Sequence, residues 1–131
     1  MNSEMKKILL VDDDMDYLFV TKSAIEGMGF EVVTAEGQNE AEERIKEFKP
    51  DLAILDLMME NEDSGFILSY KLKKKYPDVP VIIATSVTAE TGYTFDLSAP
   101  GEKQWIKADM YMDKGIRKDQ LQREIRKLLK L

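Results

Sequence analysis

Short apolar runs alternate along this chain with longer segments in which apolar residues recur at helical spacing. Each run is brief and bounded by polar or turn-forming residues, which predicts buried strands of a parallel sheet. The predicted strands are Lys7–Val11, Glu31–Ala35, Leu52–Asp56, Val81–Thr85 and Asp109–Asp113. The clearest predicted helices are Met15–Met28, Ser64–Tyr76 and Lys118–Lys130. Strands that alternate with helices predict right-handed crossovers and an α/β fold with helices on both faces of the sheet.

The ends of the helices carry their own signals. Asp14 is predicted to cap the first helix, and Gly29 is predicted to end it. A further helix is predicted before Pro50, with Asn39 as its cap and Glu42 as the capping-box partner. These signals place every helix between two predicted strands or after the last one.

The segment Ser86–Ala108 has the weakest pattern. It contains Gly92, Pro100 and scattered aromatic residues, and only a short helix at Glu102–Lys107 is predicted within it. A loop this long in a compact domain is usually functional or mobile.

Length and composition narrow the functional classes. The 131 residues predict a single domain, 1–131, and the net charge of −6 disfavours direct binding to nucleic acid. The chain has no cysteine and no histidine, which excludes disulfides, thiolate chemistry, a histidine phosphocarrier and histidine-ligated metals. The apolar stretch near the amino terminus is too short for a signal peptide or a membrane span. We therefore expect a cytoplasmic protein without a membrane partner.

Acidic residues stand at the ends of two predicted strands, and a lysine follows a third. Asp12, Asp13 and Asp14 follow the first strand, Asp56 ends the third, and Lys114 follows the last. In parallel sheets ligands bind beyond the carboxyl ends of the strands, so these groups are expected to converge. Crowded carboxylates need a cation between them, and hard oxygen ligands favour Mg²⁺. A carboxylate in such a place is also a competent nucleophile for phosphoryl transfer.

Four sequence segments together indicate a family. They are ILLVDDD, LAILDLMM, VPVIIATS and ADMYMDKG, in this order along the chain. With them the chain resembles a response-regulator receiver domain, the phosphoacceptor module of bacterial two-component signalling. The resemblance covers about Lys6 to Leu131. It implies a flavodoxin-like (βα)5 sandwich with strand order 2-1-3-4-5 and the first and last helices on one face.

The resemblance also implies roles for single residues. Asp56 is then the residue that is phosphorylated. Asp13 binds Mg²⁺ directly, Asp12 binds it through water, and the backbone carbonyl of Met58 adds a ligand. By the same resemblance, Thr85 supplies a hydroxyl that bonds the phosphoryl group, and Lys114 is the counter-cation of that group. Tyr111 takes the position of the aromatic switch residue.

The implied function is signalling rather than enzymatic turnover. Phosphorylation by a sensor histidine kinase or a phosphotransfer protein is expected to shift a conformational switch that controls binding of a downstream protein effector. We expect a monomer or a weak homodimer. No effector domain follows Leu131, so the domain either acts alone or is a fragment of a longer protein.

The chain departs from the family's usual pattern near the site. Glu60 stands where a proline is usual, and the loop from Met58 to Gly65 is about one residue longer. Gly115 replaces the proline that usually follows Lys114. We expect a trans bond at Lys114-Gly115, with Gly115 using its backbone freedom. Lys114 is then expected to be less firmly held before phosphorylation and to become ordered once an anion binds.

Two alternatives compete with this interpretation. The spacing Asp12-x-Asp14 matches the nucleophile and acid/base pattern of haloacid-dehalogenase-type phosphohydrolases, but it leaves Asp56 without a role. A pseudo-receiver would bind partners without being phosphorylated, which the presence of Asp13, Asp56, Thr85 and Lys114 disfavours.

Overall fold

The computed structural model describes residues 5–57, 64–85 and 108–131, and within them it contains five parallel strands and four helices. The strands are β1 (Lys7–Val11), β2 (Glu31–Ala35), β3 (Leu52–Asp56), β4 (Val81–Thr85) and β5 (Met110–Asp113). The helices are α1 (Met15–Glu26), α2 (Gln38–Glu47), α3 (Ser64–Lys75) and α5 (Lys118–Leu129). Met58, the predicted helix at Glu102–Lys107 and nearly all of Ser86–Ala108 lie outside these residues.

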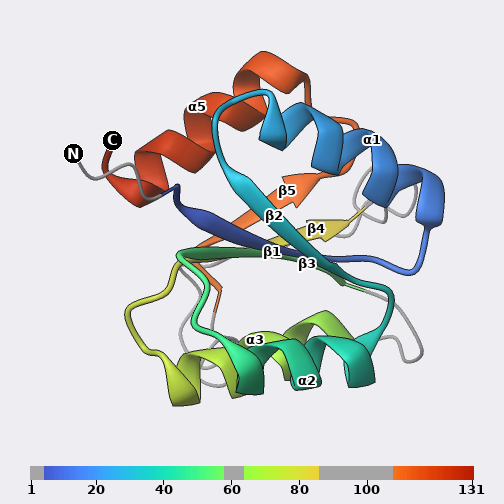
Figure 1. The fold of residues 1–131 in the computed structure, drawn as a ribbon, viewed down its shortest axis with the longest axis vertical. Helices are drawn as coiled ribbons and strands as arrows, with labels where there is room; N and C mark the ends of the chain where they lie inside the picture. Colours follow the sequence, from blue (N-terminus) through green and yellow to red (C-terminus); the bar gives the residue numbers. More distant parts are fainter. Residues whose placement is uncertain (1–4, 58–63, 86–107) are drawn as a thin grey trace.

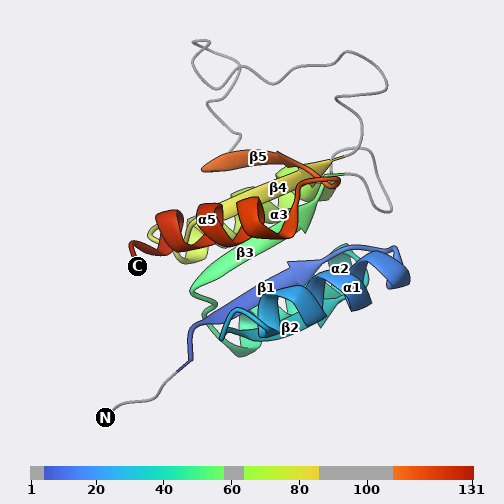
Figure 2. The ribbon, with the colours of Figure 1, turned by 90° about the horizontal axis from the view of Figure 1, so that it is seen from above.

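The sheet has the strand order β2-β1-β3-β4-β5, as predicted, with β2 and β5 at its edges (Figure 2). Helices α1 and α5 cover one face, and α2 and α3 cover the other (Figure 1). The fold is therefore flavodoxin-like. None of the helices in the described part of the chain has the length and apolar character that crossing a membrane requires.

Each face of the sheet has its own hydrophobic core, because side chains alternate along every strand. Ile8 and Leu10 of β1 pack beneath α1 and α5 together with Ile125, which is completely buried. Leu9 and Val11 point to the opposite face, where they pack with Leu68 of α3 and its neighbours. All residues of β3 and β4 are buried, so the central strands have no solvent-exposed face and are held firmly between the layers.

Four strands have the predicted bounds, and the fifth begins one residue later, at Met110. Asp109 has a different role, because its carboxylate accepts a hydrogen bond from the Val81 amide (2.8 Å) and pairs with Lys73 (2.7 Å). The helices end one or two residues earlier than predicted. Past the end of α1, Gly29 adopts a φ of 97°, which glycine tolerates best.

The predicted cap of α2 is wrong. Gly37, not Asn39, is the N-cap, and it offers no side chain to the helix. Glu40 instead reaches back past the N-cap and accepts a hydrogen bond from the amide of the preceding residue, Glu36 (2.8 Å). Glu42, the predicted partner, pairs with Lys71 of α3 (2.9 Å).

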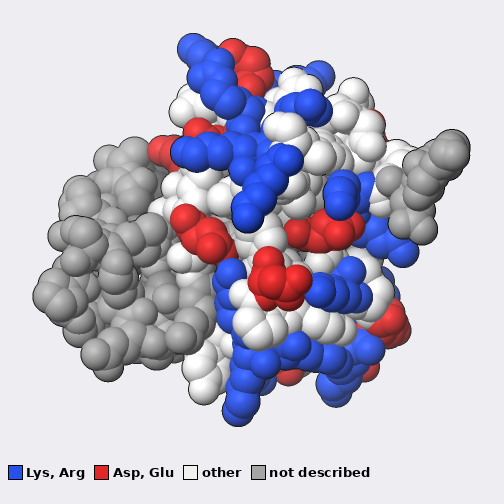
Figure 3. Space-filling view, turned by 90° about the vertical axis from the view of Figure 1, so that its left-hand side faces the viewer, with Lys and Arg blue, Asp and Glu red and all other residues white. Residues whose placement is uncertain are grey.

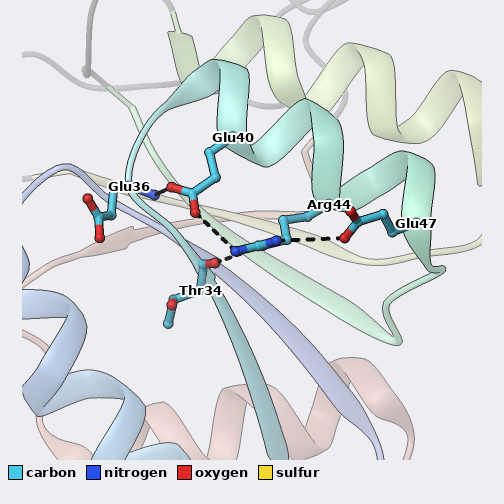
Figure 4. Close-up of polar contacts among 5 residues, drawn as sticks. All are labelled: Thr34, Glu36, Glu40, Arg44 and Glu47. Atoms are coloured by element: carbon cyan, nitrogen blue, oxygen red, sulfur yellow. Dashed lines mark hydrogen bonds and ion pairs between the residues drawn. The ribbon is translucent and has the colours of Figure 1, made fainter.

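Arg44 connects α2 to β2, the edge strand of the sheet (Figure 4). Arg44 donates from Nε to the carbonyl of Thr34 in β2 (3.3 Å) and pairs with Glu40 (3.0 Å) and Glu47 (3.7 Å). A free strand edge invites pairing with other chains. The guanidinium occupies one exposed carbonyl of that edge and so helps to keep it closed.

Candidate functional site

The predicted site residues come together at the carboxyl ends of four neighbouring strands. Asp12 follows β1, Asp56 ends β3, Thr85 ends β4 and Lys114 follows β5. Carboxylate oxygens of Asp12, Asp13 and Asp56 all lie within 4.8 Å of one another. The parallel register of the strands produces this convergence, as the sequence predicted.

Asp12 and Asp13 differ sharply in exposure. Asp12 is fully buried, whereas Asp13 is exposed. Asp12 accepts a hydrogen bond at Oδ1 from the Asp14 amide (2.9 Å), which fixes the turn into α1. Its Oδ2 lies 2.8 Å from Lys114 Nζ, but among the described residues it has no partner with hydrogen-bond geometry.

Asp14 is occupied by a structural task. Its carboxylate accepts hydrogen bonds from the amides of Asp16 (3.0 Å) and Tyr17 (3.2 Å), so it is the N-cap of α1 as predicted. A carboxylate that accepts two backbone amides is poorly suited to act as a general acid. This observation disfavours the haloacid-dehalogenase alternative, in which Asp14 would have that role.

The pKa of Asp56 is raised from 3.8 to about 6. Burial is the largest cause, since only 5% of the residue is exposed, and the negative charges of Asp12 and Asp13 add to it. The ammonium of Lys114 opposes the shift. The crowded carboxylates therefore carry more negative charge than one lysine can compensate.

Lys114 is already held firmly. Its Nζ pairs with Asp12 Oδ2 (2.8 Å) and Asp56 Oδ1 (3.0 Å), and its amide donates to the Thr85 carbonyl (3.1 Å). Burial by itself lowers the pKa of Lys114, but the two carboxylates outweigh it and the pKa is raised. The ammonium is thus paired before any anion binds, and a firmer hold after phosphorylation stays a prediction.

The bond between Lys114 and Gly115 is trans, as predicted, since the described chain has no cis peptide. The proposed reason fails, however, because Gly115 does not adopt a positive φ. Its amide instead donates to Asp113 Oδ1 (2.7 Å), and a Cβ at this position would lie 3.3 Å from the same oxygen. The turn after β5 thus depends on this hydrogen bond.

The two predicted switch residues lie in the neighbouring strands β4 and β5. Thr85 is 2% exposed at the end of β4, in register with Asp113 of β5. Tyr111 is half-buried and meets Phe66 of α3 edge-on, with ring centroids 6.2 Å apart. Its ring therefore packs on the α2–α3 side of the sheet.

Two residues near the site were missed from the sequence. The Tyr17 ring lies over Lys114, with Nζ 5.0 Å from its centroid. A Cβ on Gly65 would lie 2.5 Å from the Asp56 carbonyl oxygen and 2.7 Å from Leu57 Cα, so only glycine lets α3 begin this close to β3. For Gly65, its position beside the start of a predicted helix was a signal that the sequence offered. For Tyr17 the sequence offered no signal, because Tyr17 and Lys114 lie far apart in the chain.

The donor set fits Mg²⁺. It consists of carboxylate oxygens, one of which, Asp12 Oδ2, is buried without a hydrogen-bond partner among the described residues. Hard oxygen ligands and a surplus of negative charge are what this cation requires.

Comparisons with known proteins agree with this geometry. A family model described as the response regulator receiver domain matches residues 8–126. A receiver domain protein (CheY-like) from Methanospirillum hungatei JF-1 superposes with a TM-score of 0.81 at 28% identity, over 97% of this chain and 95% of that one. The response regulator TrrA from Thermotoga maritima, solved with Mg²⁺ and BeF, gives a TM-score of 0.76 at 31% identity, over 95% and 99%.

Curated relatives are longer proteins. The probable transcriptional regulator ycf27 of Cyanophora paradoxa is 32% identical over 99% of this chain and 51% of its own length. PhoP of Bacillus subtilis, a regulatory protein of alkaline phosphatase synthesis, is 27% identical over 95% and 49%. The chain spans about half the length of these relatives. On the family match and the shared fold, this chain belongs to the receiver domains of two-component response regulators, which are signalling modules.

Proposed function

We propose that Asp56 accepts a phosphoryl group in a Mg²⁺-dependent reaction. The observation that carries the proposal is the buried Asp56 carboxylate, grouped with Asp12 and Asp13 and paired with Lys114 at 3.0 Å. An Asp56 oxygen attacks phosphorus, the bond from phosphorus to the donor atom breaks, and the donor leaves with that electron pair. The product is an aspartyl phosphate.

The neighbouring groups would stabilise the transferring phosphoryl group. Asp12, Asp13, Asp56 and the Met58 carbonyl would hold Mg²⁺, which supplies positive charge at the phosphoryl oxygens. Lys114 supplies a second positive charge, and it needs to shift only from the carboxylates to the incoming oxygens. The Thr85 hydroxyl is proposed as a hydrogen-bond donor to the same group.

The direct test is incubation with acetyl phosphate, with and without Mg²⁺, followed by intact-protein mass spectrometry. One phosphoryl adduct is expected, only with Mg²⁺, and none in Asp56→Asn. Asp51→Asn is the matched control, because Asp51 precedes the same strand at the opposite end of the sheet. An adduct that survives in Asp56→Asn would overturn the assignment, and no adduct on the wild type from either acetyl phosphate or a phosphorylated kinase would favour the pseudo-receiver.

We propose a histidine kinase or a phosphotransfer protein as the physiological donor. An apolar patch on α1 supports this, since Met15, Phe19 and Val20 are 56%, 75% and 64% exposed directly after the acidic residues. Exposed apolar patches of this kind commonly mark protein contacts. With such a donor, we also propose a cytoplasmic location for this chain.

The patch can be tested with a histidine-phosphorylated donor found by profiling a kinase panel. Phe19→Ser should slow transfer from that protein several-fold and leave the acetyl phosphate reaction unchanged. Tyr70→Ser is the control, because Tyr70 is also an exposed aromatic residue (41%) but lies on α3. Equal effects of the two variants on the protein donor would remove the patch from the proposal.

Phosphorylation is proposed to shift a conformational equilibrium rather than to build a new structure. Thr85 would move toward the phosphoryl group, and Tyr111 would repack against its neighbours, altering a surface for a protein effector. A hollow of about 470 Å³ lined by β5 and the start of α5 lies beside Tyr111. Amide chemical shifts with beryllofluoride and Mg²⁺ should change most at 85–108 and 111–116. Changes limited to residues that touch the phosphoryl group would argue against a switch.

We further propose that residues 1–131 form one receiver domain, that they act as a monomer or a weak homodimer, and that they do not contact nucleic acid or membranes themselves. The family match over 8–126 supports the first statement, and the net charge of −6 supports the last.

A further inference from the structure

One aromatic ring near the acidic cluster has no part in the reaction as described above. Tyr17, in the first turn of α1, places its ring over the Lys114 ammonium, with Nζ 5.0 Å from the ring centroid. This is within the distance of about 6 Å at which a cation is attracted by the face of an aromatic ring. Lys114 therefore has carboxylates at 2.8 and 3.0 Å and, in addition, an aromatic face.

The ring is held in this place at several points. The Tyr17 amide donates to the Asp14 cap (3.2 Å), and the side chain packs against the core beneath α1 and α5. Burial raises the pKa of Tyr17, so the phenol stays neutral at physiological pH. The lysine thus meets a fixed, uncharged surface.

We propose that Tyr17 is a positioning residue that keeps the Lys114 ammonium at the phosphoryl site, an inference that rests on the proposed function. The carboxylates attract Lys114 strongly only while their charge is not shared with a cation. The attraction of the ring does not depend on that charge. A lysine side chain is long and flexible, with several rotamers available. The ring limits those rotamers when the carboxylates bind Mg²⁺ and the lysine must turn to the phosphoryl oxygens.

Two substitutions separate this role from simple packing. Tyr17→Phe keeps the aromatic face and loses only the hydroxyl. Tyr17→Leu keeps apolar volume and loses the face. If the Leu variant does not fold, pentafluorophenylalanine at position 17 keeps the shape of the ring and removes the negative potential of its face.

The first measurement uses the Mg²⁺-free protein and needs no reaction. The Lys114 ε-methylene protons should be shifted upfield by the ring in the wild type and in Tyr17→Phe, and this shift should vanish in Tyr17→Leu. The second measurement is the rate of Asp56 phosphorylation by acetyl phosphate with saturating Mg²⁺. Tyr17→Phe should match the wild type, and Tyr17→Leu and the pentafluoro variant should be slower by about three- to tenfold.

The outcomes distinguish this inference from the proposed function. A wild type that is never phosphorylated on Asp56 overturns the proposed function and the positioning role with it, whatever the methylene shifts show. A phosphorylated wild type with equal rates in the Phe and Leu variants, or with a pentafluoro variant as fast as Phe, overturns the positioning role alone. An unshifted Lys114 methylene signal in the wild type also overturns it, because the contact would then not exist in solution.

Discussion

The two ends of the sheet treat charged residues in opposite ways. Where the strands begin, Asp51 and Asp78 each have their own donor and neither is fully buried: Asp51 accepts from the Lys7 amide (2.7 Å), and Asp78 pairs with Lys49 (3.0 Å). Where the strands end, Asp12, Asp13 and Asp56 cluster together, two of them are buried, and among the described residues Lys114 is the one cation that pairs with them. The acids at the first end are therefore compatible with a stable fold, whereas the crowded carboxylates at the second end destabilise it.

The end at which the strands begin also carries many basic residues (Figure 3). The last turn of α3 contributes Lys73, Lys74 and Lys75, and the last turn of α5 contributes Arg126 and Lys127. Positive charges near a helix carboxyl terminus are favourable. The pKa of Asp78 at this end is lowered by its hydrogen bond from Lys49, whereas the pKa of Asp56 at the other end is raised by burial. A buried carboxylate whose ionised form is unfavourable indicates a site at which a bound cation would stabilise that form.

The largest expected effect follows from Asp56. Because its pKa is raised from 3.8 to about 6, the folded protein retains a proton that the unfolded chain releases. This stabilisation is complete below about pH 4 and is lost as the pH rises through about 6. At 1.36 kcal/mol for each pKa unit, the loss is about 3 kcal/mol.

Asp56→Asn removes this dependence. Relative to the wild type, the variant should gain up to about 3 kcal/mol of unfolding free energy between pH 4 and pH 7, measured by urea denaturation in EDTA. Mg²⁺ at pH 7 should stabilise the wild type and not the variant. If the difference in unfolding free energy between the two proteins stays constant across this pH range, the pKa of Asp56 is not raised in the folded state.

Gly65→Ala should be the next most damaging change. The new Cβ would lie 2.5 Å from the Asp56 carbonyl oxygen, and backbone atoms cannot rotate away. We expect a loss of about 1–3 kcal/mol of unfolding free energy and slower phosphorylation, because the end of β3 must shift. Gly27→Ala is the matched control, since its Cβ would meet its nearest atom at 3.4 Å. Equal stability of the two variants would mean that the end of β3 tolerates displacement.

Gly115→Pro tests the turn that presents Lys114. Proline removes the amide that donates to Asp113 Oδ1 at 2.7 Å and restricts the backbone of Lys114 as well. A cost of about 1 kcal/mol is expected from the lost hydrogen bond, together with a lower rate of phosphorylation by acetyl phosphate. Asp113→Ala removes the same bond from the other side and serves as the control. If phosphorylation rate and Mg²⁺ affinity are unchanged in Gly115→Pro, the glycine has no mechanical role.

The comparison of the two ends also shows what the sequence could predict. Four apolar residues in a row, as in Val81–Ala84, have few stable places other than a buried strand, so the strands and the convergence of Asp12, Asp56 and Lys114 were predictable. The cap of α2 was not, because Gly37 and Asn39 are both acceptable caps by residue type. The choice depends on Glu40 reaching the Glu36 amide, a contact that exists only in the folded protein. The pairing of the Lys114 ammonium with Asp12 and Asp56 likewise exists only in the folded protein.

The smallest effect is expected at the opposite end of the sheet. Lys49→Met removes the partner of Asp78, but both side chains are at least half exposed, and solvent screens their interaction. The pKa of Asp78 is lowered by this pair, so its contribution is present above the unfolded pKa and lost as the pH falls. The midpoint of urea unfolding at pH 7 should change by no more than the error of the measurement, and 0.5 M NaCl, which screens solvent-exposed charges, should weaken any remainder. A clear, salt-resistant loss in Lys49→Met would show that the charges at this end also hold the fold, and that the contrast with the Asp56 end is one of degree.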